Sequence, residues 1–242
     1  MQPHIRCDNS LNVKYALLPG DPERLNRVAE YLDEVEEVAY NREYRTLTGK
    51  YKGVGLAVTS TGIGGPSMAI AIEELKNIGI ENFIRIGSAG SLNSNINLGE
   101  MLIPYGAVRN DGTGNMYVEE SYPAVAHPEI FSALVQAAKD NDFKYHQGIS
   151  RSHDSFYIDN EKEINNYWSN KGLIGADMET APLFVLAGLR GVKAASVLNV
   201  VNAFQGDLDE SINEYVDLSE VTSKGEKRII KTALAAIKII DG

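Results

Sequence analysis

The sequence predicts an α/β fold, with one domain over residues 1–242 and a central mixed sheet flanked by helices on both faces. Apolar runs of strand length alternate with segments of helical periodicity, which favours a mostly parallel or mixed sheet covered on both sides. A length of 242 residues with 43% hydrophobic residues suits one large α/β domain. Three of the apolar runs end directly in glycine-rich turns, as strands do where they lead into helices.

The first half of the chain supplies the strand–turn–helix units. Residues 13–18 form an apolar run and are predicted to be a strand, after which Pro22 suits the first position of a helix. Residues 54–59 are the next predicted strand. Residues 66–78 carry apolar side chains at helical spacing, and 83–86 form a further short strand.

The second half continues the alternation. Residues 101–108 are predicted to be a strand and 130–140 a helix. A helix over 177–189 ends before Gly191 and is followed by a long buried strand over 192–201. The chain closes with a helix whose apolar stripe includes Ile229, Ile230, Ala233, Leu234, Ile237 and Ile240. Two polar stretches, 110–122 and 205–215, are predicted to be loops that lie over a site.

The charge balance excludes some classes of partner. The formal net charge is −10 and the isoelectric point is near 4.9, which disfavours a surface for nucleic acid or for an anionic membrane. No apolar run approaches the roughly 20 residues of a membrane span, and the first residues lack the apolar core of a signal peptide. The single Cys7 excludes an intrachain disulfide. We therefore expect a cytoplasmic protein.

The glycine-rich turns predict an anion site. A strand that ends in a glycine turn and opens a helix presents backbone N–H groups at the positive end of the helix dipole. Turns of this kind follow the strands at Gly20, Gly62 and Gly87, and the first and third carry Arg24 and Arg85. Since ligands in such sheets bind at the carboxyl ends of the strands, the arginines favour a small anion there, most simply phosphate.

Arg85 and Arg24 also have ordinary explanations. Arg85 lies between two apolar isoleucines, and strand alternation turns it to the opposite face, where a buried arginine needs an anionic partner. An internal carboxylate satisfies that requirement as well as a bound phosphate does. For Arg24, the Gly-Asp-Pro turn alone favours the ordinary explanation, a solvated arginine beside a tight turn.

The remaining candidates also have ordinary explanations, and two of them, Glu179 and Phe156, have a functional interpretation as well. Arg42 fits a charged hairpin or edge segment. Glu179 fits a carboxylate at the start of a helix or an acceptor for a sugar diol. His4 is explained as an exposed residue near the terminus. Phe156 either packs in the core or stacks on a planar ligand. No metal-ligand spacing and no Walker loop occurs in the sequence.

Taken together, these segments resemble the nucleoside phosphorylase family of the uridine phosphorylase and hexameric purine nucleoside phosphorylase type. The resemblance covers nearly the whole chain, from about His4 to the last helix. The segment 61–67, together with Glu43, is most similar to the uridine branch. The resemblance implies a nucleoside phosphorylase-like fold.

The resemblance also implies roles for the matched residues, with Arg85 and Glu179 as the catalytic pair. The implied phosphate site comprises Gly20, Arg24, Arg85 and Ser88, with Arg42 reaching in from a neighbouring subunit. The implied ribose site comprises Asp177, Met178 and Glu179, with His4 from a neighbour. The implied base site comprises Phe156, Asn160, Lys162, Val201 and Asn202. In the uridine branch, the positions of Glu43, Ile63 and Ser67 line a monovalent-cation site between subunits, which implies a possible K⁺ ion here.

The sequence departs from the family pattern at the base. Uridine enzymes usually carry a Gln and an Arg where this chain has Asn160 and Lys162. Purine enzymes carry a Ser-Asp pair where this chain has Val201 and Asn202, and Asn cannot act as the acid that protonates a purine. The usual Glu before the Met is Asp177 here.

These observations predict an enzyme that cleaves the N-glycosidic bond of a ribonucleoside with inorganic phosphate, giving free base and ribose 1-phosphate. Uridine is slightly favoured, and a purine nucleoside is the alternative. A nucleoside hydrolase of the same fold and a non-catalytic nucleoside-binding protein are further alternatives. We expect no organic cofactor, and a homo-oligomer, by resemblance a hexamer built from dimers that share active sites.

Overall fold

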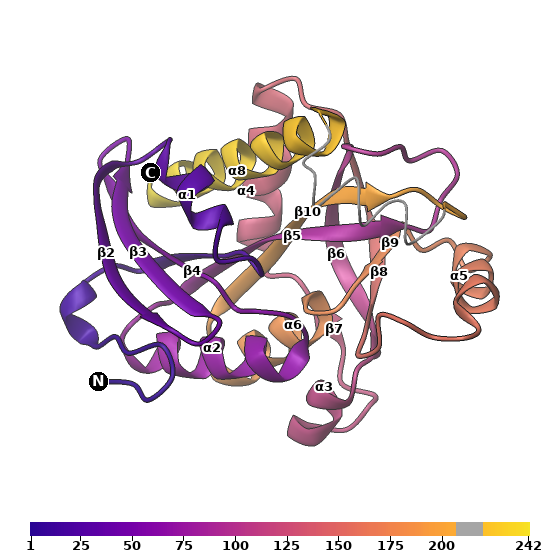
Figure 1. Cartoon of the computed structure of the whole chain (residues 1–242), viewed down its shortest axis with the longest axis horizontal. Coiled ribbons are helices and arrows are strands. Elements are labelled where there is room, and N and C mark those ends of the chain that lie inside the picture. The colour runs from indigo at the N-terminus through magenta and orange to yellow at the C-terminus, as the bar shows by residue number, and fades with distance from the viewer. Residues whose placement is uncertain (207–219) are drawn as a thin grey trace.

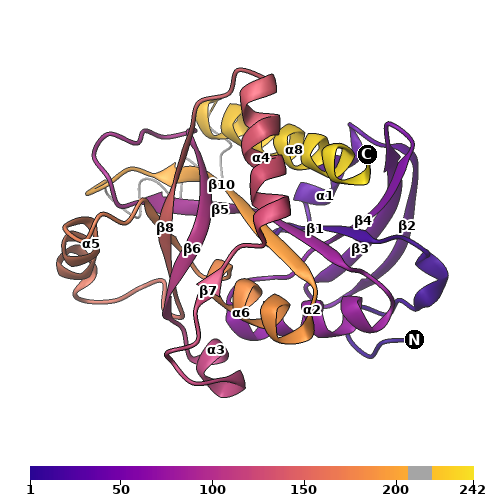
Figure 2. The ribbon, with the colours of Figure 1, turned by 180° about the vertical axis from the view of Figure 1, so that it is seen from behind.

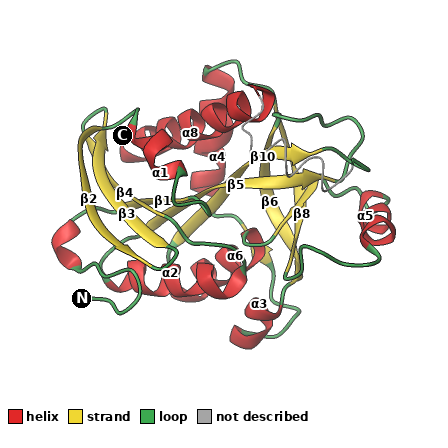
Figure 3. Cartoon of the chain, viewed as in Figure 1, coloured by secondary structure: helices red, strands yellow, loops and turns green. Residues whose placement is uncertain are grey.

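The computed structural model describes residues 1–206 and 220–242. Its strands form one mixed sheet, flanked by helices as Figures 1 and 3 show. The strands are β1 (Tyr15–Leu18), β2 (Asp33–Asn41), β3 (Tyr44–Tyr51), β4 (Val54–Thr59), β5 (Asn82–Ser91), β6 (Met101–Asn110), β7 (Ala124–Val125), β8 (Tyr145–His153), β9 (Gly175–Asp177) and β10 (Lys193–Asn202). The helices are α1 (Arg24–Ala29), α2 (Gly65–Asn77), α3 (Gly112–Tyr117), α4 (Pro128–Asp140), α5 (Glu161–Ser169), α6 (Thr180–Arg190) and α8 (Glu220–Asp241).

Part of the sheet closes on itself. β5 pairs with β10, β10 with β6, β6 with β8, β8 with β9, and β9 with β5 again, so these five strands form a ring. The rest of the sheet continues from β5 through β1, β4 and β3 to β2. Because β1 runs parallel to both β4 and β5, and β5 parallel to β10, the carboxyl ends of these four strands face the same side.

Two hydrophobic layers lie on opposite faces of the sheet. Along β1, Leu17 belongs to the layer under α1, α4 and α8, whereas Ala16 and Leu18 belong to the layer under α2 and α6. This alternation is the period-two pattern of a strand buried on both faces. Figures 1 and 2 show α4 and α8 on one side of the sheet and α2 and α6 on the other.

The predicted fold class is confirmed, and several element boundaries differ. The strand over 54–59 has the predicted bounds, and Gly191 adopts the left-handed conformation just after α6. The first helix begins at Arg24 rather than at Pro22, and α6 begins at Thr180 because residues 175–177 pair as β9. The predicted loop over 110–122 contains α3, and residues 207–215 of the second predicted loop lie outside the described residues.

β7, β8 and α5 were not predicted, and β2 and β3 were anticipated only as a charged hairpin or edge segment around Arg42. The pattern that defines a strand or helix from sequence is apolar periodicity. Residues 33–37 of β2 are exposed and mostly acidic, and α5 has no buried residue. In the described parts of the chain, no helix combines the length and apolar character that a membrane crossing requires.

Glu100 ties the start of β6 to the start of β8. Its carboxylate lies 2.6 Å from Lys144 Nζ and 2.7 Å from His146 Nε2. Burial alone would raise the pKa of Glu100, but hydrogen bonds from Lys144, His146 and Asn97 outweigh it and lower the pKa to about 2.

We expect Glu100→Gln to lower the free energy of unfolding by about 1–3 kcal/mol at pH 7. Because the pKa of Glu100 is lowered in the folded chain, its stabilisation is complete above the unfolded value of 4.5 and is lost as the pH falls toward 2. Urea unfolding between pH 7 and pH 2.5 measures this, with Glu163→Gln on α5 as the exposed control. A deficit that stays constant across this pH range would contradict the assignment.

Candidate functional site

A large pocket lies where the carboxyl ends of β1, β4, β5 and β10 meet those of β8 and β9. Its volume is about 1310 Å³. Its lining residues come from the glycine-rich turns after these strands, from the segment between β8 and α5, and from the start of α6. This is the edge of the sheet at which the sequence placed its anion site.

Arg85 joins two carboxylates at one end of the pocket. Its Nε lies 3.0 Å from Asp177 Oδ2, and its Nη2 lies 2.6 Å from Glu179 Oε2. All three side chains are buried. As predicted from strand alternation, Arg85 points away from the face that holds Ile84 and Ile86. Arg85 therefore has internal carboxylates as its partners, which is the ordinary explanation given above. Arg85 also lines the pocket, so an anion in the pocket can reach it.

Asp177 and Glu179 have different surroundings. Asp177 accepts hydrogen bonds from Ser152 Oγ at 2.7 Å and from Thr180 Oγ1 at 2.6 Å. Glu179 Oε1 accepts a hydrogen bond from the backbone N–H of Gly64 at 2.5 Å. Burial raises the pKa of Glu179, the charge of Arg85 opposes that shift, and the nearby carboxylate of Asp177 adds to it. The charge of Arg85 is thus shared by two carboxylates, and both carboxylates accept further hydrogen bonds from neighbouring groups.

Arg24 is buried rather than solvated, so that explanation of it is wrong. Its Nε donates to Glu226 Oε2 at 2.7 Å, its Nη1 to the carbonyl of Ile86 at 2.8 Å, and its Nη2 to Ser88 Oγ at 3.2 Å. Arg27 also pairs with Glu226 and lies 2.9 Å from Asp21. This network connects α1, β5 and α8, and two of its members, Arg24 and Asp21, line the pocket together with Gly20 and Ser88.

The first two glycine turns form one continuous rim. The N–H of Gly62 donates to the carbonyl of Gly20 at 3.0 Å, and the N–H of Thr61 donates to the carbonyl of Pro19 at 2.9 Å. A Cβ at Gly20 would lie 3.0 Å from the Gly62 carbonyl oxygen, so the close approach of these turns favours glycine. Gly20 and Gly62 both line the pocket.

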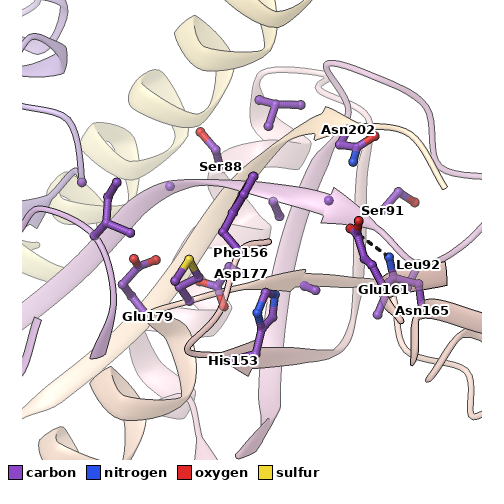
Figure 4. A pocket seen from close by; sticks show the side chains of 18 of the residues that line it. Ser88, Ser91, Leu92, His153, Phe156, Glu161, Asn165, Asp177, Glu179 and Asn202 are labelled. Atoms are coloured by element: carbon purple, nitrogen blue, oxygen red, sulfur yellow. Dashed lines mark hydrogen bonds between the residues drawn. The ribbon is translucent and has the colours of Figure 1, made fainter. Parts of the chain in front are cut away.

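The other end of the pocket carries a group of polar side chains, and an aromatic ring separates it from the carboxylate end (Figure 4). Phe156 lies between the Asp177–Glu179 end and a group that includes Asn202, Glu161 and Asn165. Asn165 Nδ2 donates to Glu161 Oε1 at 3.3 Å. Lys162, Val201 and Met178, to which the resemblance assigns base or ribose contacts, also line the pocket.

Asn160 is not among the residues that line the pocket. It precedes α5, and its carbonyl accepts a hydrogen bond from Ile164 N–H at 3.1 Å. Two unpredicted residues of the α5 region, Glu161 and Asn165, line the pocket instead. His153 lines it too; burial first and then the charge of Arg151 lower the pKa of its imidazole, which is therefore neutral at pH 7.

His4 and Arg42 lie outside the pocket of their own chain. His4 Nδ1 lies 2.6 Å from Glu74 Oε1, so His4 is held in place rather than freely exposed. Arg42 is exposed in the turn between β2 and β3, with a φ of 56°. The hairpin interpretation of Arg42 is thus confirmed within this chain.

The residues of the implied cation site gather around the second glycine turn. A Cβ at Gly62 would lie 2.8 Å from Glu43 Cγ and 3.5 Å from Ser67 Oγ. Ser67 Oγ donates to the carbonyl of Ile63 at 3.1 Å. Carboxylate, carbonyl and hydroxyl oxygens are donors that suit a hard cation, so these residues fit such an ion.

Glu226 is the clearest residue that sequence reasoning missed. It is buried and binds Arg24, a predicted phosphate residue. A signal was present, because Glu226 lies three residues before Ile229 and so occupies the apolar stripe of the last helix. A carboxylate in such a stripe requires a buried cationic partner.

A family model described as the phosphorylase superfamily matches residues 14–238. The chain therefore belongs to the phosphorylase superfamily. It is 42% identical to the uridine phosphorylase of Thermococcus kodakarensis over 252 residues, covering 99% of this chain and 87% of the relative. It is 35% identical to the guanosine phosphorylase of Halorubrum lacusprofundi over 236 residues, covering 98% of each.

The solved structures agree with these relatives. The crystal structure of uridine phosphorylase from Vibrio fischeri ES114 superposes with a TM-score of 0.91 at 43% sequence identity. The match covers 98% of this chain and 97% of that chain.

We expect Arg85→Met to destabilise the fold by about 3–5 kcal/mol at pH 8, because it leaves two carboxylates buried without their cation. The loss should shrink toward pH 5, because burial already raises the pKa of Glu179, and without the charge of Arg85 this carboxyl takes up a proton more readily in the folded chain. Thermal and urea unfolding at pH 8 and pH 5 measure the difference.

The matched control is Arg190→Met, which breaks the partly exposed pair with Glu73 and should cost about 1 kcal/mol or less. Equal losses for the two variants would contradict a central role for the Arg85 ion pairs.

Proposed function

We propose that this enzyme is a nucleoside phosphorylase that favours uridine. Inorganic phosphate attacks the anomeric carbon of the ribonucleoside while the N-glycosidic bond breaks, giving free base and ribose 1-phosphate. The observation that carries the proposal is Arg85 beside Glu179 in the pocket, next to the Gly20 turn and the Arg24–Ser88 pair. The similarity to uridine phosphorylases over nearly the whole chain supports it.

Phosphate binding uses the arginine end of the pocket. Arg85 and Ser88 reach the pocket from β5, and Arg24 is held against Ser88 by its bonds to Glu226 and Ile86. Fixed guanidinium groups bind a phosphate dianion with little reorganisation. Holding the dianion beside the sugar can lower the activation free energy by roughly 7–11 kcal/mol at best.

The sugar lies between the phosphate and the base, beside Met178 and Glu179. A carboxylate that accepts hydrogen bonds from the ribose hydroxyls orients the ring and favours the positive charge of an oxocarbenium-like transition state. Because Arg85 contacts both Asp177 and Glu179, it links the phosphate and ribose parts of the site.

The base then stacks near Phe156 and receives hydrogen bonds as it takes up negative charge. Lys162 and Asn202 line this end of the pocket and are the proposed donors; Asn160 would have to turn toward it. Asn202 in place of an acid disfavours purine protonation. Because one relative is a guanosine phosphorylase, purine nucleosides are the second candidate class of substrate.

The active unit is proposed to be a homo-oligomer, by resemblance a hexamer built from dimers that share active sites. His4 and Arg42 lie outside the pocket of their own chain, as expected for residues that serve a neighbour's ribose and phosphate. The proposal includes no organic cofactor. A monovalent cation such as K⁺ would be held by Glu43, Ile63 and Ser67. The single, buried Cys7 supports a reducing, cytoplasmic setting.

The direct test is base release from uridine, inosine, guanosine and adenosine, with and without inorganic phosphate. We expect release only with phosphate, and fastest release from uridine. Release at the same rate without phosphate would make the enzyme a hydrolase. Tight binding of a nucleoside without release would support the binding-protein alternative.

Mixing two impaired variants tests the shared site. We expect Arg42→Ala and Glu179→Gln each to lower kcat/KM about 10- to 100-fold, as a lost interaction with a charged group can do. If Arg42 serves a neighbour's pocket, hybrid oligomers contain some pockets with both residues intact. Subunits that are dissociated, mixed and reassembled should then regain a sizeable fraction of wild-type activity. Mixtures no more active than their components would contradict sharing, as would a fully active monomer in sedimentation.

A further inference from the structure

The second glycine turn, Thr61–Gly65, has a contact that the phosphate site does not explain. Its Gly64 N–H points to Glu179 Oε1 at 2.5 Å rather than to an anion site of its own. The other oxygen of the same carboxylate, Oε2, binds Arg85 at 2.6 Å. Glu179 is therefore held from two sides, by a backbone amide and by a guanidinium.

We infer that the backbone N–H of Gly64 is a positioning group for Glu179, fixing the carboxylate that orients the ribose. This inference rests on the proposed function. Phosphate, once bound, competes with Glu179 for the guanidinium of Arg85. The bond from Gly64 involves a different carboxylate oxygen, so it persists when Arg85 turns to the phosphate.

The backbone conformation explains why glycine stands at this position. Gly64 has a φ of 92° and a ψ of 168°, a region that is essentially limited to glycine. A Cβ here would meet only Pro66 Cδ, at 3.9 Å, so the space beside Gly64 is open. The requirement is therefore conformational: this φ and ψ aim the N–H at Glu179.

The rest of the turn holds Gly64 in that conformation. Gly64 immediately precedes α2, and its carbonyl accepts the N–H of Met68 at 3.2 Å. Ser67 Oγ donates to the carbonyls of Ile63 and Gly64 at 3.1 and 3.2 Å. The positive end of the α2 dipole lies at this turn, which also favours the ionised form of Glu179.

The test is a double-mutant cycle between Gly64→Ala and Glu179→Ala, measured as kcat/KM for uridine at saturating phosphate. Gly79→Ala is the matched control, because Gly79 follows the other end of α2, has a φ of 103° and has open space around its Cβ position. Gly64→Ala should lower kcat/KM for uridine about 10- to 100-fold, as loss of a hydrogen bond to a charged group does. The KM for phosphate should change less than about threefold, and Gly79→Ala should leave both values unchanged.

The decisive measurement is the effect of Gly64→Ala when Glu179 is already Ala. A positioning role predicts almost no further loss, because the group that Gly64 positions is absent. An equal loss in both backgrounds would overturn the inference. If Gly64→Ala does not fold, Ser67→Ala replaces it, with a smaller loss expected and the same dependence on Glu179. A wild-type enzyme that releases no base from any nucleoside would instead refute the proposed function.

Discussion

The ion pairs of Arg85 with Asp177 and Glu179 are the constraint on which the site depends. A guanidinium in the middle of a sheet strand is tolerated only with anionic partners. Here Asp177 is the last residue of β9, and Glu179 immediately precedes α6. The fold must therefore bring the end of β9 to β5, which the closed ring of five strands does. The ring thus brings the carboxylates close enough to pair with buried Arg85, and all three charged residues line the pocket.

The central strands and their helices were predictable because their apolar patterns reflect burial on two faces. The runs at 54–59 and 192–201 needed no tertiary information, since each is a nearly continuous apolar run that is buried along most of its length. β2 and α5 escaped prediction because their residues are mostly exposed and carry no apolar period. The closure of the ring depends on the short β9, which no local pattern distinguishes from a helix start.

The site was predictable to the extent that its residues follow strand ends. Gly20, Arg85 and Ser88 lie where the turns predicted them, because parallel strands bring their carboxyl ends together. Glu226 and Glu161 are separated from these turns in sequence and reach the site only through packing of α8 and the position of α5. His4 and Arg42 lie outside the pocket of their own chain, and their proposed roles depend on an assembly that a single chain does not contain.

Because the ring closes one end of the sheet, β2 is left as an edge strand at the other end. Ring closure leaves β2 as the terminal strand of the sheet path, with its backbone edge unpaired by a further strand of the described chain. Such an edge invites pairing with a second copy and leads toward aggregation. β2 carries Asp33, Glu34, Glu36 and Glu37 on exposed positions, and like charges oppose edge-to-edge pairing of two copies. The charges of this strand, which gave no apolar pattern for prediction, therefore disfavour β-pairing at this edge of the sheet.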